Sequence, residues 1–189
     1  MKKAVITAVA LTLVLCLAVG GTLAYLVATS DPVTNTFTVG DIKIDLAETK
    51  EGPFKVVPGA TDAKDPSVTV ESGSEKCYVY VKITNDLVIG NDTVATYNIG
   101  SEWVLVGTSG NAKLYRYGEV VDAATADVKK PVFTTVTYDG EKITKANIET
   151  LKNKTIVLQA YAHQSENITG VSVADTAANT WAGTVAVAP

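Results

Sequence analysis

The chain has 189 residues, with 16 Lys and Arg against 20 Asp and Glu, and a formal net charge of −4. This acidic balance argues against nucleic acid or an anionic membrane surface as the main partner. The length suits one domain that can bury a sizeable core.

The first 24 residues have the order of a secretory signal peptide. Lys2 and Lys3 are followed by an uncharged apolar run over residues 4–19 and then by the small residues of GGTLA. The run of about 16 residues is shorter than the roughly 20 that span a bilayer as a helix, and this order is typical of an exported precursor that is cleaved. The alternative is an uncleaved membrane anchor. The expected cleavage positions are Ala24, Tyr25 and Leu26.

Removal of this leader changes both the charge and the cysteine count. It takes away Lys2, Lys3 and Cys16, which leaves 14 basic against 20 acidic residues, a net charge of −6. Cys77 is then alone, so an intramolecular disulfide is excluded. We expect Cys77 to be a small buried apolar residue, with an intermolecular disulfide as the alternative. Leu15 stands before Cys16 where a lipoprotein has a small residue, which argues against lipidation.

Residues 25–47 form a segment between the leader and the main domain. Within residues 37–46, Ile42, Ile44 and Leu46 point to one face of a strand with period-two alternation. The simplest role of this strand is the first strand of the chain's own domain, and the alternative is donation to another subunit. The candidate donor anchors are Phe37, Val39, Ile42, Ile44 and Leu46.

Residues 48–189 are expected to form one β domain. Turn-forming pairs such as Pro58-Gly59 mark a connection over residues 48–65, with a short extended piece at 54–57. Alternating patterns predict strands at 67–71, 77–85, 102–106, 113–117, 132–138 and 155–163. Residues 86–100 have no clear pattern, residues 120–130 predict a loop with a helical turn, and residues 183–189 predict an apolar tail.

Two short helices complete this expectation. One is predicted over residues 143–151, and the other runs to about Trp181 from a capping-box-like start at Ser172 and Asp175. The fold class is therefore mainly β: an antiparallel jelly-roll-like β-sandwich with one or two short helices, preceded by a cleaved signal peptide.

The alternation in the strand at 77–85 predicts which of its faces is turned toward the core. Its apolar row should face the core, and its tyrosine row should be partly covered by a loop or by a second subunit. The apolar row is Cys77, Val79, Val81 and Ile83; the other row is Tyr78, Tyr80, Lys82 and Thr84.

The stretch of about 30 residues from Gly20 to Glu48 resembles the TasA/CalY (camelysin) family. The resemblance rests on GGTLAY at the leader's end, NTFTVG at residues 35–40, and IKIDL at 42–46 followed by Glu48. The family implies a leader cut by the SipW-type signal peptidase of Gram-positive bacteria. The family's usual aromatic-acidic pair after the cut is replaced here by Leu26-Val27, so the cut is expected within a residue or two of Ala24.

The same resemblance implies location and partners. It implies a secreted jelly-roll subunit of biofilm matrix fibres, in which the processed N-terminal segment of one subunit adds as a strand to the sheet of the next. The expected partners are further copies of the chain, a signal peptidase during export, and other matrix or cell-wall components. A monomeric secreted module that binds the cell wall through its tyrosine-bearing face is the second hypothesis.

Catalytic patterns are missing from the sequence. The camelysin branch carries a metallopeptidase label, but a zinc protease needs a cluster of ligands, and His163 is the chain's one histidine. GxSxG and nucleotide-binding glycine loops are also missing. We therefore expect a protein that is not an enzyme and uses no cofactor or metal, with His163 as a strand-end residue.

Two weaker alternatives remain for binding: a calcium site and a carbohydrate platform. Asp62 with Asp65, or Asp122 with Asp127, would supply oxygen ligands for calcium, although neither pair has EF-hand spacing. Trp103, Trp181 and the tyrosines would form a carbohydrate platform if they lay together on the surface.

Overall fold

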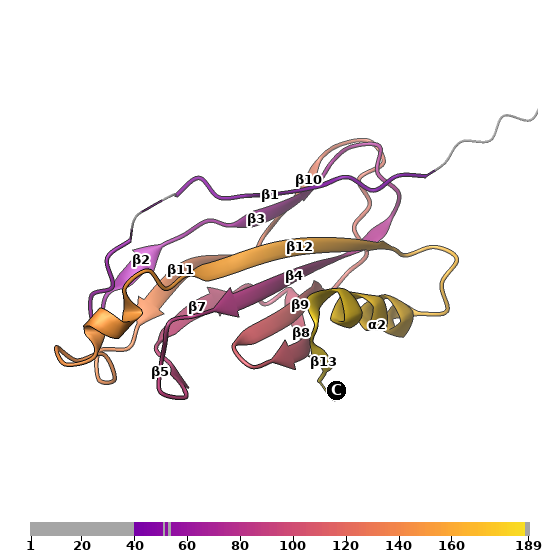
Figure 1. Ribbon diagram of the computed structural model, residues 1–189. Helices are drawn as coiled ribbons and strands as arrows, with labels where there is room; N and C mark the ends of the chain where they lie inside the picture. Colours follow the sequence, from indigo (N-terminus) through magenta and orange to yellow (C-terminus); the bar gives the residue numbers. More distant parts are fainter. Residues whose placement is uncertain (1–39, 51, 53, 188–189) are drawn as a thin grey trace, which may run out of the picture. The chain divides into compact units, whose positions relative to one another are not determined.

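The structure is a computed structural model that describes residues 40–50, 52 and 54–187. The leader, the cleavage positions and the anchors Phe37 and Val39 lie outside the described residues. The described chain is mainly β and its sheets are antiparallel (Figure 1). Its strands are β1 (Ile44–Ala47), β2 (Thr61–Ala63), β3 (Ser67–Val70), β4 (Cys77–Asn85), β5 (Val88–Ile89), β6 (Asp92–Thr93), β7 (Ala95–Ile99), β8 (Trp103–Ser109), β9 (Ala112–Tyr117), β10 (Val128–Pro131), β11 (Phe133–Tyr138), β12 (Ile156–Gln164) and β13 (Val185–Ala186). Its helices are the 3-10 helix η1 (Ile148–Leu151) and the α-helix α2 (Val171–Ala182).

Two three-stranded sheets make up the first layer. Their strand orders are β1-β3-β10 and β2-β11-β7. Pairing continues across the break between them, because Lys64 N donates to Thr134 O (2.8 Å) and Val132 N donates to Pro66 O (2.9 Å). Pro66 has no N–H to donate, which interrupts the regular ladder at this point.

A five-stranded sheet of order β12-β4-β9-β8-β13 makes up the second layer. Cys77, Val79, Val81 and Ile83 of β4 are fully buried, which confirms that the apolar row faces the core. They share one cluster with Val68 and Val70 of β3 and with Phe133 and Val136 of β11, so this core joins the two layers.

The helix α2 covers the outer face of the five-stranded sheet (Figure 1). Ala174, Ala178 and Ala182 pack against Tyr80, Val106 and Leu114, so the tyrosine row is covered by the chain's own helix. The small alanines let the helix backbone approach the sheet closely.

The start of α2 differs from the predicted capping box. The N-cap is Gly170, with φ 84° and without a side-chain cap hydrogen bond. Asp175 instead bonds to residues of the sheet, as described below. The prediction was wrong because α2 begins at Val171, which places Ser172 inside the helix, and because Asp175 pairs with a distant arginine that spacing along the helix cannot reveal.

Six strands and one helix boundary were also misjudged. The strands that were not predicted are β2, β5, β6, β7, β10 and β13, and η1 covers only the end of the helix expected over 143–151. Residues 54–57 are not a strand, and β10 lies where a loop with a helical turn was expected. The sequence of β10 is mostly polar, and Lys129 and Pro131 are exposed. Its strand conformation comes from pairing with β3.

Candidate functional site

Three of the five candidate donor anchors, Ile42, Ile44 and Leu46, are among the described residues, and they lie in the first layer of the chain's own domain. β1 pairs antiparallel with β3 in the register Ile44↔Val70 to Ala47↔Ser67. Ile42, Ile44 and Leu46 are half-buried and pack against the core. In this structure β1 is therefore an edge strand of its own domain.

A polar clamp holds the chain immediately after β1. The Asp65 carboxylate accepts hydrogen bonds from Thr49 N and Lys50 N, each at 3.0 Å, and from the Thr49 hydroxyl. Glu48 Oε1 lies 3.1 Å from Lys64 Nζ. The Thr49 hydroxyl bond, with smaller help from the two amides, holds the pKa of Asp65 below its ordinary value of 3.8. The clamp fixes the point at which the N-terminal segment joins the domain.

The side of the sandwich between β1 and β12 is incompletely covered. β1 and β12 are neighbours, but β1 pairs with β3 and β12 pairs with β4, so among the described strands no ladder joins the two. Their inward apolar side chains are all half-buried, whereas those of β3 and β4 are fully buried. We call this strip the seam; it consists of Ile42, Ile44 and Leu46 from β1 and Ile156, Leu158, Ala160 and Ala162 from β12.

The outer edge of β12 borders the seam and lacks the residue types that protect a sheet edge. Its nine residues, IVLQAYAHQ, include no charged residue, proline or glycine. The other edge strands described are at most five residues long, and the edge strand β10 carries Lys129, Lys130 and Pro131. Charges, prolines and short length are how proteins prevent strand addition, so β12 is the edge best suited to accept another strand.

A hollow lies at each end of β12. At the Ile156 end, a hollow of about 1060 Å³ has the core residues Leu87, Val136 and Leu151 in its floor. We call it the basic groove, because its charged lining is Lys55, Lys64, Lys152 and Lys154 against Glu48 and Glu149. At the Gln164 end, a hollow of about 600 Å³ adjoins Gly40. We call it the acidic exit, because its charged lining is Asp41, Glu75 and Glu166 against Lys76.

The four aspartates considered for calcium make protein hydrogen bonds. Asp62 accepts from the Tyr138 hydroxyl (2.8 Å), Asp122 from Ala124 N (3.1 Å) and Asp127 from Ser72 N (2.8 Å). Asp65 is engaged in the clamp. Within the residues that the structure describes, no group of three or more His, Cys, Asp and Glu side chains is arranged to hold a metal ion.

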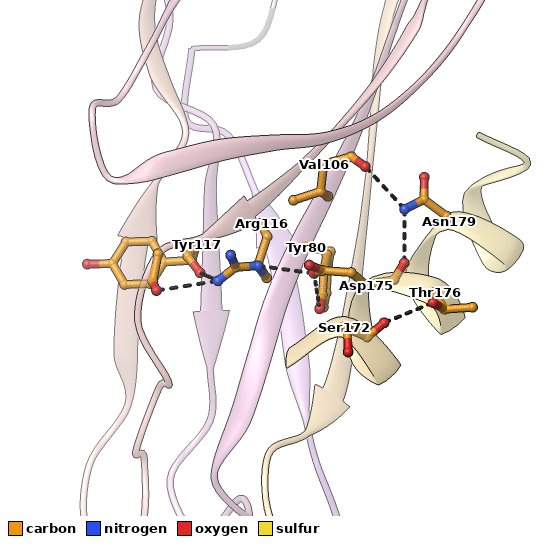
Figure 2. A network of polar contacts seen from close by, with 9 residues as sticks. Tyr80, Val106, Arg116, Tyr117, Ser172, Asp175, Thr176 and Asn179 are labelled. Atoms are coloured by element: carbon orange, nitrogen blue, oxygen red, sulfur yellow. Dashed lines mark hydrogen bonds and ion pairs between the residues drawn. The ribbon is translucent and has the colours of Figure 1, made fainter. Parts of the chain in front are cut away.

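A polar network joins α2 to the sheet (Figure 2). Asp175 Oδ1 lies 3.1 Å from Arg116 Nε and accepts a hydrogen bond from the Tyr80 hydroxyl at 2.9 Å. Burial, and then the bond to Asp175, raises the pKa of Tyr80. Asn179 Nδ2 donates to Val106 O (3.2 Å) and Asp175 O (2.9 Å). The network lies between two packed elements, so its evident role is to hold the helix in place.

The aromatic candidates are divided between core and surface. Trp103 is 5% exposed and donates from Nε1 to Pro131 O at 2.8 Å, and Tyr80 is fully buried. Trp181 is 39% exposed and stacks on Tyr161, with ring centroids 5.1 Å apart. The structure therefore assigns Trp103 to the core and leaves a two-ring stack between Trp181 of α2 and Tyr161 of β12.

Two single residues lie where the sequence predicted. Cys77 is a free and buried thiol whose pKa is raised to about 11 by burial, which agrees with a small core residue. His163 is the penultimate residue of β12, and its Nδ1 lies 2.8 Å from Gln164 O.

Comparison with protein-family models, with curated proteins and with solved structures finds no match to this chain. Among the described helices, none has the length and apolar character needed to cross a membrane.

The features that sequence reasoning missed are the β12 edge, the clamp and the two hollows. A signal for the first was present, because residues 156–164 form the strongest strand pattern near the C-terminus and carry no charge. The clamp and the hollows bring together residues at least 15 positions apart, so no local pattern predicts them.

Proposed function

We propose that this chain is an exported structural subunit of extracellular fibres, in a biofilm matrix or at the cell surface, assembled by N-terminal strand addition between copies. The observation that carries the proposal is the uncharged nine-residue edge of β12 beside the half-buried seam. The resemblance to the TasA/CalY family supplies the fibre and matrix context.

The donor in this proposal is the segment ahead of Gly40 of another copy. About 14 residues, 26–39, lie between the expected cut and the described domain. In extended form they reach about 46 Å at roughly 3.3 Å per residue, which exceeds the roughly 30 Å length of β12. The donor is therefore long enough to cover the whole acceptor edge.

The chain directions of β1 and β12 also fit strand addition between copies. Ile42 and Gln164 line the hollow at one end, and Glu48 and Ile156 line the hollow at the other, so β1 and β12 run in opposite directions. A strand that continues the line of β1 into a neighbouring copy would thus pair antiparallel with that copy's β12. Every described pairing in the domain is antiparallel as well.

Strand addition at this edge would use two kinds of interaction. Main-chain hydrogen bonds to β12 supply affinity, and alternate side chains of the donor set the register. Phe37 and Val39 share one face of the donor and are suited to cover the apolar seam. The contact is heterologous, so it continues as an open filament. While the leader is attached, membrane tethering holds the donor and restrains growth.

The test is electron microscopy of the secreted protein and of a variant that lacks residues 28–39. We expect filaments from the native chain, and a monomer with an unchanged circular dichroism spectrum from the variant. Filaments of normal appearance from the shortened chain would refute donation by this segment.

A matched pair of substitutions sharpens this test. Phe37→Lys with Val39→Lys places charges on the face that meets the seam, and should abolish filaments. Thr36→Lys with Thr38→Lys places the same charges on the opposite face of the same strand, and should leave filaments intact.

The exposed stack of Trp181 on Tyr161 favours a second candidate function, a monomeric module that binds wall polysaccharide. This function predicts a chain that stays monomeric at high concentration and binds cell-wall material. It also predicts that Trp181→Ala abolishes that binding.

A further inference from the structure

We propose that the basic groove of one copy binds the acidic exit of the next copy, so that charge decides the direction and the salt sensitivity of end-to-end association. This inference rests on the proposed fibre function, and it names the surfaces that deliver the donor strand to its acceptor. The occupant of the groove is a second copy of this chain.

Among the residues that the structure describes, the lining of the groove has more lysines than carboxylates. Lys64 is paired with Glu48 at 3.1 Å and also lies over the Phe54 ring, 3.5 Å from its centroid. Lys55, Lys152 and Lys154 remain against Glu149, and all four of these residues are exposed. A basic patch of this kind stands out on a chain that is acidic as a whole.

The exit carries the opposite charge. Asp41, Glu75 and Glu166 are exposed, and the nearby Lys76 lies 3.6 Å from Asp122, which offsets its charge. The peptide of Asp41 is fixed to the domain, because Glu75 N donates to Asp41 O at 2.9 Å. The carboxylates are thus held around the point where the N-terminal segment joins the described chain.

The two surfaces lie at opposite ends of the same strand, because Ile156 lines one hollow and Gln164 lines the other. An acidic surface at one end and a basic surface at the other complement each other between copies and do not complement themselves. Two copies therefore attract when they stack head to tail and repel when like ends meet. Head-to-tail stacking places the C-terminal end of the donor, where it joins Gly40, beside the Ile156 end of the neighbour's β12.

This arrangement predicts a strong dependence on ionic strength. The charges are exposed, so their attraction is screened beyond about 10 Å at 0.1 M salt and beyond about 3 Å at 1 M. Such complementarity mainly raises the association rate and selects the orientation. The β12 edge and the seam would supply the lasting affinity.

The experiment uses two charge-reversed variants of the secreted protein. The first combines Lys152→Glu and Lys154→Glu, and makes both ends acidic. The second combines Glu75→Lys and Glu166→Lys, and makes both ends basic. The matched control, Lys113→Glu with Lys129→Glu, reverses two exposed lysines on β9 and β10 away from both hollows. Association is measured by sedimentation velocity and light scattering at about 50 mM salt.

We expect each charge-reversed variant alone to nucleate at least about tenfold more slowly than the native chain. An equimolar mixture of the two should regain assembly with strictly alternating copies, because each acidic groove then meets a basic exit. The control should assemble like the native chain. Carbodiimide treatment of the native protein should join Lys152 or Lys154 of one copy to Glu75 or Glu166 of another.

The outcomes separate this inference from the proposed function. If either variant alone assembles at the native rate and salt dependence, the electrostatic contact is wrong and strand addition stands. If the native chain gives the expected crosslinks but never more than short oligomers, the contact stands and the fibre function is wrong. If the groove variant assembles normally and has lost affinity for an anionic amphiphile such as dodecanoate, the groove serves a small ligand and the contact between copies is refuted.

Discussion

Asp175 Oδ1 on α2 lies 3.1 Å from Arg116 Nε on β9. Both side chains are mostly buried, with 25% and 15% of their surfaces exposed, and the Tyr80 hydroxyl donates to the same carboxylate oxygen. This pair therefore joins the helix to the outer face of the five-stranded sheet (Figure 2).

Replacing Asp175 with Ala should destabilise the fold, because it leaves the Arg116 charge and the Tyr80 hydroxyl without their partner. We expect a loss of about 1–3 kcal/mol in the free energy of unfolding, measured by urea denaturation. Glu119→Ala, at an exposed position, is the control and should change stability by less than about 0.5 kcal/mol. Equal stability of Asp175→Ala and the native chain would show that the pair is not needed to hold α2.

Enlarging Ala178 should also loosen α2. Ala178 is fully buried against the sheet, so Ala178→Leu forces extra volume into a packed interface and should cost about 1–3 kcal/mol. Thr180→Leu places the same side chain on the exposed face of the helix and should be nearly neutral. Urea midpoints and near-ultraviolet circular dichroism would record both effects; a neutral Ala178→Leu would contradict close packing there.

The Asp65 clamp should make the start of the domain sensitive to acid. The pKa of Asp65 is lowered in the folded state from 3.8, so the ionised carboxylate favours folding. That contribution is complete above about pH 5 and disappears as the pH falls through the lower folded value. Hydrogen exchange at the Thr49 and Lys50 amides should accelerate in that acid range, beyond the intrinsic change with pH, and should already be fast at pH 7 in Asp65→Asn. Slow exchange in that variant would mean that other contacts hold the segment.

A lysine in the seam should block assembly without unfolding the chain. Ala160 is half-buried on the inward face of β12, and a lysine there can extend its amine to solvent across the acceptor edge. We expect Ala160→Lys to lower filament yield at least about tenfold, consistent with edge-strand protection by lysine. Gln159→Lys adds the same charge to the opposite face of the same strand and should assemble normally. Equal loss in both variants would point to net charge as the cause.

Locking β1 to β3 distinguishes addition of a strand from exchange of β1. Asp45 and Thr69 are opposite each other in the register, so Asp45→Cys with Thr69→Cys can form a disulfide within one copy. Since the proposed donor lies ahead of Gly40, we expect the oxidised protein to form filaments as well as the reduced protein does. Filaments that appear only after reduction would show that Ile42, Ile44 and Leu46 leave with the donor.

The residue pattern determined the fold class and much of the strand placement. Alternation over 77–85 and 155–163 identified β4 and β12, because side chains of successive strand residues point to opposite faces, and the buried row of β4 was assigned correctly. The small apolar character of Cys77 and the helix before Trp181 followed from local patterns in the same way. β7 and β10 were missed because their strand conformation depends on pairing with β11 and β3, which lie far away in the sequence.

Only the tertiary structure decided where polar side chains find partners and which edges remain open. Asp175 looked like part of a cap, yet it pairs with Arg116, 59 positions away. The partners of Asp65 in the chain after β1 were likewise not predicted from the sequence. The seam and the opposite charges at the two ends of β12 arise where distant strands meet. A local pattern records which face of a strand is apolar, but whether that face or edge is covered depends on neighbours that only folding brings together.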